Sequence, residues 1–207
     1  MQNKFCNSPF LFITIIKNDA ATIKEINKLD NASYALYVQL KTYELIANGT
    51  RLENLDNSLL YLPNENELKN AMFTSIATNY PSKYIYKKDF NRAYEIIKYL
   101  LNDEFIYTPL TKILLEGELG FISIINNKME DLENIFTKEN LKYIQMLKTE
   151  ISAQRILYAY YLLYKKDFDK AKKIKENINK HSKNILKGIR KDEFELIDLI
   201  ESRANFI

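Results

Sequence analysis

The sequence predicts an all-α fold, an α-solenoid of four to five helical hairpins with a period of about 39 residues and a C-terminal capping helix. The leading observation is a phrase that occurs twice: residues 86–93 read YKKDFNRA, and residues 164–171, which lie 78 positions later, read YKKDFDKA. A weaker copy centred on Met129 lies halfway between them, and Leu52 continues the series toward the N-terminus. Self-similarity at a period of roughly 20–50 residues is typical of solenoid proteins.

Composition and apolar spacing predict the same fold class. The 207 residues include only four glycines and four prolines, too few for the turns of a β-sandwich or barrel, and no alternating strand pattern of useful length occurs. After the second copy of the phrase, apolar side chains share one helical face: Phe168, Ala171, Ile174 and Ile178. Asp89 and Asp167 directly precede the helices of the two copies, where a carboxylate accepts free backbone N–H groups. The phrase therefore predicts helix starts at residues 90 and 168.

The same reasoning, applied along the chain, predicts one helical-repeat domain over residues 1–207. The predicted hairpins cover residues 5–29, 32–61, 65–101, 109–135 and 139–179, and the capping helix covers residues 192–204. The last hairpin is expected to open with one continuous helix over residues 139–164, and Pro81 is expected to kink or split the helix before Phe90. The apolar stretch 10–16 is too short to span a membrane, which needs about 20 residues, so we expect a buried first helix there.

The repeated phrase resembles the tetratricopeptide (TPR) family. In that family the second helix of each unit opens with an acidic residue, an aromatic residue, a charged pair and a small residue, as residues 89–93 and 167–171 do here. The family also favours a small residue twelve positions before the alanine, and Ala159 and Gly120 occupy that position in two units. The other two units depart from this pattern, and the period exceeds the family's roughly 34 residues. The resemblance implies a TPR-like array whose first helices line a concave groove for a protein or peptide.

A second resemblance is to the soluble helical tail of small membrane-embedded zinc proteases of the site-two class. It is carried by residues 45–51 (LIANGTR), 59–63 (LLYLP) and 157–163 (LYAYYLL). This resemblance implies a regulatory or C-terminal domain that lacks the catalytic part, or a stand-alone relative. A membrane protease would then be the partner.

Residue types that carry out catalysis are sparse in this chain. A His-Glu-x-x-His zinc site cannot form because His181 is the single histidine, and its polar neighbours indicate a solvated or helix-capping role. Cys6, the single cysteine, allows no intramolecular disulfide, so a reducing, cytoplasmic compartment is expected. The four glycines form no phosphate-binding loop, and the acidic pairs are expected to face water. We therefore predict no enzyme activity, no cofactor and no metal.

The predicted partner-binding residues are aromatic. By the register of the repeat, four side chains would lie on or near the concave surface and capture a peptide or helix: Tyr86, Phe121, Tyr160 and Tyr164. The alternative is that they pack between units as core, which is the usual fate of apolar stripes at helical spacing.

A basic segment provides a third interpretation of function. Residues 165–191 hold eleven lysines and arginines against three acidic residues, which is compatible with a nucleic-acid-binding face. The other interpretation is a polar helix face that keeps the chain in solution, and the lack of an Arg-rich or aromatic-stacking signature favours it. A net charge of only +3 requires no polyanionic partner. We therefore expect a protein or peptide partner in preference to nucleic acid.

Overall fold

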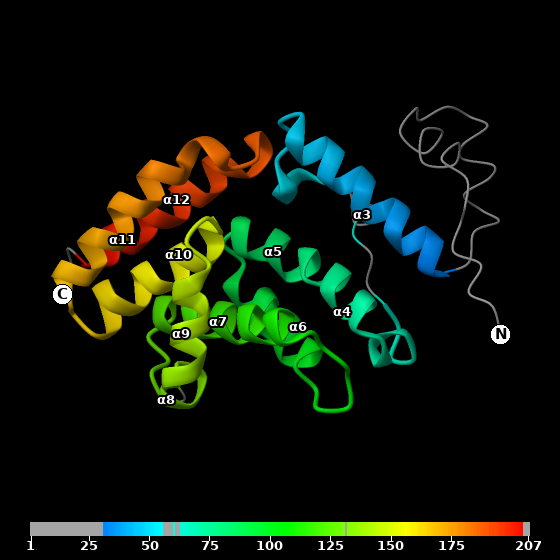
Figure 1. The fold of residues 1–207 in the computed structure, drawn as a ribbon, viewed down its shortest axis with the longest axis horizontal. Coiled ribbons are helices and arrows are strands. Elements are labelled where there is room, and N and C mark those ends of the chain that lie inside the picture. The colour runs from blue at the N-terminus through cyan, green and yellow to red at the C-terminus, as the bar shows by residue number, and fades with distance from the viewer. Residues whose placement is uncertain (1–30, 56–59, 61–62, 131, 205–207) are drawn as a thin grey trace.

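The computed structural model describes residues 31–55, 60, 63–130 and 132–204 (Figure 1). Within these residues every regular element is a helix and no β-strand occurs, which confirms the all-α fold class. The predicted first hairpin, residues 5–29, lies outside the described residues. The sequence predicts the second helix of the hairpin over residues 32–61 at residues 52–61, but its described part is only the 3₁₀ turn η1 (Leu52–Asn54). The backbone at Leu55 is extended and ends this turn, so the expected helix is wrong at its start, and residues 56–59 and 61–62 lie outside the described residues.

The described helices before residue 101 lie within the predicted hairpins and include the expected break, but the first part of the hairpin over residues 65–101 is interrupted once more, at Asn70. In chain order they are α3 (Asn31–Ala47), the 3₁₀ turn η3 (Glu67–Lys69), α4 (Ala71–Ala77), α5 (Asn79–Tyr86) and α6 (Phe90–Leu100). Pro81 lies in the first turn of α5 and has no N–H to donate to the carbonyl of Ala77, the last residue of α4. The expected split at this proline therefore separates α4 from α5.

The helices after residue 108 differ from the prediction at two places. In chain order they are α7 (Pro109–Ile125), α8 (Leu132–Ile135), α9 (Lys138–Met146), α10 (Ile151–Ala159), the π-helix η4 (Tyr160–Tyr164), α11 (Phe168–His181), the 3₁₀ turn η5 (Ser182–Asn184) and α12 (Lys187–Ala204). The prediction of one continuous helix over residues 139–164 is wrong, because a turn divides it into α9 and α10. The side-chain amide of Gln154 donates to the carbonyl of Leu147 at 3.1 Å, which holds this turn against α10. The C-terminal helix begins at Lys187, five residues before the predicted start.

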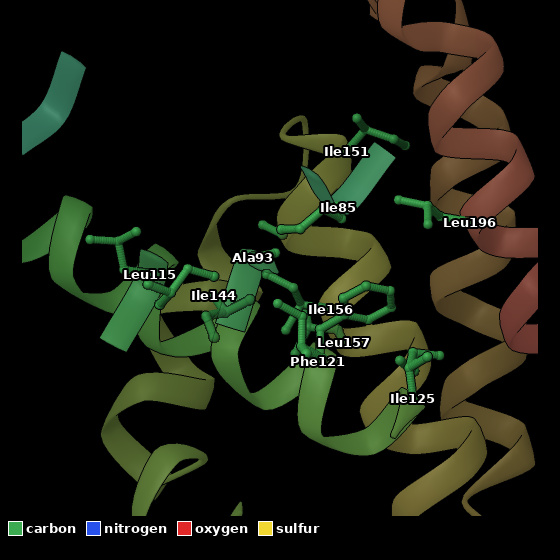
Figure 2. Packing of buried hydrophobic residues seen from close by; sticks show 14 of the residues in the cluster. Ile85, Ala93, Leu115, Phe121, Ile125, Ile144, Ile151, Ile156, Leu157 and Leu196 are labelled. Atoms are coloured by element: carbon green, nitrogen blue, oxygen red, sulfur yellow. The ribbon is translucent and has the colours of Figure 1, made fainter. Parts of the chain in front are cut away.

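The helices pack side by side around a shared core (Figure 1). Helix α5 lies against α6, α10 lies against α11, and α7 contacts both α6 and α10. Helix α12 contacts α3, α5 and α10, which are far apart in the sequence. Figure 2 shows Phe121 of α7, Ile156 of α10 and Leu196 of α12 within this core. The C-terminal helix therefore buries apolar surface against helices from both halves of the described chain.

Two glycines allow unusually close packing. A Cβ atom on Gly120 of α7 would lie 2.5 Å from the ring of Phe136. A Cβ atom on Gly188 would collide with the backbone carbonyl of Thr50, just after α3. The first residues of α12 can therefore lie directly against the turn that follows α3 only because residue 188 has no side chain.

Four helices end at a residue in the left-handed region of backbone conformation. In the part of the chain that the structure describes, four residues have a positive φ angle, and they are these helix ends: Gly49 (106°), Lys88 (61°), Asn127 (56°) and Lys166 (53°). After each of the first three, the N–H of the next residue donates to the carbonyl five positions earlier at 2.8–2.9 Å, as in a Schellman helix end. After the fourth, the N–H of Asp167 donates to the carbonyl of Tyr161, six positions earlier, at 2.8 Å. The extra position arises because the residues before this turn form the π-helix η4.

Candidate functional site

A cavity of about 370 Å³ lies between α4, α5, α7 and α10. Part of its wall is apolar: Pro81, Ile85, Ile97, Leu114 and Leu115. Leu110, at the beginning of α7, also lines the cavity and is 49% exposed, so the cavity reaches the protein surface beside an apolar side chain. A volume of this size lies at the lower end of the range for small-molecule and side-chain pockets.

A second part of the wall, called here the hydroxyl wall, consists of serine and threonine side chains: Ser75, Thr78, Ser82, Thr108, Thr111 and Ser152. The hydroxyl of Thr111 lies 2.9 Å from that of Ser75 and 2.7 Å from that of Thr108. Thr108 is also the N-cap of α7, because its hydroxyl accepts from the N–H of Thr111. The N-cap interaction that starts α7 therefore also holds the hydroxyl groups of Thr108 and Thr111 next to each other at the cavity.

The charged end of the cavity is lined by Tyr86, Glu118 and Arg155. Together with the buried Glu193, which pairs with Tyr86 and Arg155, they are called here the Arg155 cluster. The guanidinium of Arg155 donates from Nε to Glu193 at 2.9 Å and from Nη2 to Glu118 at 2.6 Å. The hydroxyl of Tyr86 donates to the other oxygen of Glu193 at 2.8 Å. One arginine thus connects α5, α7, α10 and α12, and its guanidinium carbon lies 4.3 Å from the ring centre of Phe121.

Burial governs the electrostatics of the Arg155 cluster. Burial raises the pKa of Glu118, while the positive charge of Arg155 acts in the opposite direction. Burial also lowers the pKa of Arg155, but the carboxylates of Glu118 and Glu193 outweigh this effect and leave that pKa raised. Burial and the neighbouring Glu193 carboxylate raise the pKa of Tyr86 well above its ordinary value, so its hydroxyl stays neutral and acts as a donor. The cluster therefore pairs one buried guanidinium with the carboxyl groups of Glu118 and Glu193.

Two polar atoms in the Arg155 cluster have no hydrogen-bond partner among the described residues. They are Nη1 of Arg155, a donor, and Oε2 of Glu118, an acceptor. Arg155 is 1% exposed, so its free N–H groups cannot be satisfied by bulk solvent. A buried polar atom left unsatisfied costs about 1–3 kcal/mol, so these two atoms reduce the stability that the cluster contributes.

The four aromatic residues expected at a partner-binding surface lie in two places, and three of them are buried. Tyr86 (7% exposed) belongs to the Arg155 cluster, and Phe121 (0%) lies beneath the Arg155 guanidinium. Tyr160 (5%) and the half-buried Tyr164 lie in η4 with ring centres 5.6 Å apart. The core packing considered as the alternative describes three of these side chains, and their binding role stays a prediction. Only Tyr86 among them lines the cavity.

The acidic residues of α12 hold this helix in place. Asp192, which is 1% exposed, accepts from Nε of Arg51 at 2.6 Å, and Glu195 forms a longer ion pair with Lys88 at 3.4 Å. Burial raises the pKa of Asp192, and the Arg51 guanidinium opposes that effect. These contacts join the C-terminal helix to the turns that follow α3 and α5.

The basic segment 165–191 is partly engaged in contacts within the protein. Lys170 forms an ion pair with Asp167 at 2.9 Å, Lys175 pairs with Glu201 of α12, and Lys165 lies 4.6 Å from the ring centre of Tyr164. A nucleic-acid-binding role for this segment stays a prediction.

Comparison with known proteins finds nothing similar: no protein-family model, no curated protein and no solved structure matches this chain. The TPR and site-two protease resemblances therefore stay predictions. In the part of the chain that the structure describes, no helix is long and apolar enough to cross a membrane. Nor do three or more His, Cys, Asp or Glu side chains gather in that part to hold a metal ion.

Proposed function

We propose that the protein is a non-catalytic helical-repeat module that binds a protein or peptide partner. The observation that carries this proposal is the spacing of the left-handed helix ends at Gly49, Lys88, Asn127 and Lys166, which are 39 residues apart at every step. This spacing equals the period of the repeated phrase. A left-handed residue at a helix end, recurring at the period of the sequence repeat, is what a solenoid of helical hairpins requires. Such arrays act by presenting an extended surface to a partner.

The mouth of the cavity is the surface that we assign to the partner. Leu110 offers an exposed apolar side chain beside a space that can accept one side chain of a peptide. This choice replaces the four aromatic residues as the main contact, because Tyr86, Phe121 and Tyr160 are buried in the protein. Anchor side chains of a bound partner commonly fill pockets that exclude water, and this cavity offers such a space beside the exposed Leu110.

A peptide selection tests this proposal. Peptides selected from a displayed random library against the intact protein should lose at least tenfold in affinity when Leu110→Arg is introduced. Met146→Arg on α9 is the matched control, because Met146 is also exposed, at 67%, and does not line the cavity. Circular dichroism should give the same helix content for both variants. Equal binding by the two variants would move the partner surface away from the cavity.

Steep salt dependence would point to the alternative of the basic segment. Contacts with phosphates release counterions, so affinity for nucleic acid falls sharply as salt rises, whereas binding in an apolar cavity changes little. Measuring the affinity of the partner over a range of salt concentrations therefore separates the proposed function from nucleic-acid binding through residues 165–191.

A further inference from the structure

A second cavity, called here the lysine cavity, has a volume of about 350 Å³ and lies between α9, α10, η4 and α11. It shares no lining residue with the cavity described above. The described residues that line it include three lysines and no acidic residue: Lys148, Lys170 and Lys173. All three lysines are exposed, so their flexible side chains can move to meet a ligand.

Local geometry and two hydrogen bonds bring the three lysines to the same cavity. Lys170 and Lys173 are three residues apart in α11 and therefore lie on one face of this helix. The side-chain amide of Asn177, one turn further along that face, donates to the backbone carbonyl of Lys148 at 2.8 Å and to Oε1 of Gln154 at 3.0 Å. The turn between α9 and α10, which carries Lys148, is thereby held against α11.

The amide groups of the lining are already used within the protein, whereas two of the ammonium groups are not. Both N–H groups of the Asn177 amide donate as described, and the amide of Gln145 donates to the hydroxyl oxygen of Tyr161 at 2.9 Å. Within the described part of the chain, no hydrogen bond or ion pair engages the ammonium group of Lys148 or Lys173. A ligand in this cavity would therefore find its polar partners among the lysines.

The charge of the lysine cavity favours an anion. Asp167 is an acidic residue that acts on this group: the hydrogen bond from Lys170 and the nearby charge of Lys173 lower its pKa. Three lysines and this aspartate leave an excess of two positive charges. A phosphate monoester carries about 1.5–2 negative charges at pH 7, which balances the excess, whereas a carboxylate or a phosphate diester carries one. Lysine ammonium groups also commonly bind phosphate.

The rest of the lining is suited to carbon. Leu157 and the ring of Tyr161 are buried, and Ile174 is half-buried. These side chains can cover the carbon part of a ligand, which gains affinity by leaving water. An organic phosphate therefore fits this lining better than inorganic phosphate does.

We propose that the lysine cavity binds a phosphate monoester whose carbon part is an aromatic ring or a short alkyl group. The phosphate would lie among the lysine ammonium groups, and the carbon part would lie on Leu157 and Ile174. In a peptide partner the group would be a phosphorylated side chain, and that form of the proposal rests on the proposed function. A free small phosphate ester carries the same chemistry.

Methyl NMR of the intact protein provides the first test. Leu157 and Ile174 line the lysine cavity, and Ile97, which lines the other cavity, is the internal control. Phenyl phosphate should shift the first two signals with a saturable dependence and leave Ile97 unchanged. At equal ionic strength, benzoate, methyl phenyl phosphate and inorganic phosphate should each bind at least tenfold more weakly. Equal binding by phenyl phosphate and any of these compounds, or no shift with phenyl phosphate, would overturn the proposal.

Two neighbouring lysines provide matched variants. Lys173 lines the lysine cavity, whereas Lys172 does not, and both are exposed. Lys173→Gln should weaken the binding of phenyl phosphate at least fivefold, and Lys172→Gln should not. Both variants remove one positive charge from α11, so equal weakening would mean that only the overall charge of the helix matters and would contradict the assignment to this cavity.

Short peptides distinguish the two sources of the phosphate. Five-residue peptides should carry phosphotyrosine, tyrosine or glutamate at the centre and blocked ends. Tenfold tighter binding of the phosphotyrosine peptide, with the same methyl shifts, supports a peptide source, and binding of phenyl phosphate alone supports a free phosphate ester. Leu110→Arg, which tests the proposed function at the other cavity, should leave the binding of phenyl phosphate unchanged. Either proposal can therefore fail while the other stands.

Discussion

The two copies of the repeated phrase have the same local structure and different surroundings. In both, an aspartate caps the following helix: Asp89 accepts from the N–H of Arg92 at 3.2 Å, and Asp167 accepts from the N–H of Lys170 at 3.1 Å. The aromatic residue that follows differs in its environment. Phe90 is half-buried and meets Phe121 edge to face, whereas Phe168 is 63% exposed. A short phrase therefore specifies a turn and a helix start, while its place among the other helices decides what the phrase buries.

The helices that precede the two turns also differ. Helix α5 ends in a regular Schellman arrangement, whereas α10 continues into the π-helix η4, which adds one residue before the turn. Within η4, Tyr160 packs on Phe136 with ring centres 4.6 Å apart, and Tyr161 accepts from the side-chain amide of Gln145 at 2.9 Å. The extra residue therefore lies in a helix end whose side chains pack on Phe136 and bind Gln145.

The largest expected difference between the copies concerns their aromatic residues. Phe90→Ala should lower the free energy of unfolding by about 2–3 kcal/mol, because it removes a half-buried ring and its contact with Phe121. Phe168→Ala should change it by less than about 0.5 kcal/mol, because that ring is largely in water already. Urea denaturation of the two variants measures both values. Equal losses would mean that Phe168 is covered in solution.

The shared turn could be predicted from sequence, whereas the different fates of the two phenylalanines could not. Asp89 and Asp167 each accept a hydrogen bond from a backbone N–H three residues later, so a helix cap can be recognised from neighbouring residues in the sequence. Burial of Phe90 depends on Phe121, which comes thirty-one residues later, and nothing near Phe168 in the sequence indicates that it lacks such a neighbour. The same limit explains the error over residues 139–164, where apolar spacing continues across a turn that the Gln154 side chain stabilises.

The tyrosine that opens each copy gives the next prediction. Tyr86→Phe should cost about 1.5–2 kcal/mol, because Glu193, which is fully buried, loses the donor to one of its carboxylate oxygens. Tyr164→Phe should cost less than about 0.5 kcal/mol, because the ring contact with Tyr160 at 5.6 Å is kept. Paired denaturation curves would check this, and a costly Tyr164→Phe would show that its hydroxyl has a buried role.

Only one feature of the sequence could have indicated the candidate site. Arg155 stands inside the apolar run of residues 151–164, and a charge at such a position is buried only when it is paired. Its partners Glu118 and Glu193 lie 37 and 38 residues away and look like ordinary acids of a helical surface. Long-range pairing of this kind has no local pattern, so the cluster emerges only from the packing of α7, α10 and α12.

The left-handed residue before each aspartate should respond in the same direction in both copies. A lysine in this conformation costs roughly 1–2 kcal/mol, part of which glycine loses again through the entropy of the unfolded chain. Lys166→Gly should therefore stabilise the protein by about 0.5–1 kcal/mol. Lys88→Gly should gain less, because it also removes the ion pair with Glu195. Thermal unfolding of both variants beside Lys87→Gly, which has an ordinary negative φ of −69°, provides the check. A loss of stability at both positions would contradict the assigned turn geometry.

The smallest expected effect is a dependence on pH that belongs to the second copy. The hydrogen bond from the side chain of Lys170 lowers the pKa of the exposed Asp167, whereas the corresponding Arg92 lies over the ring of Tyr84 at 5.9 Å. A lowered pKa means that the stabilisation by the carboxylate is complete above the ordinary aspartate pKa, near about 4, and is lost as the pH falls through the lower folded-state value. Lys170→Gln should remove part of this acid dependence, and Lys172→Gln, a neighbouring exposed lysine, should not. Denaturation curves between pH 2 and pH 6 would decide the matter, because identical profiles for the two variants would show that the Lys170 contact does not persist in solution.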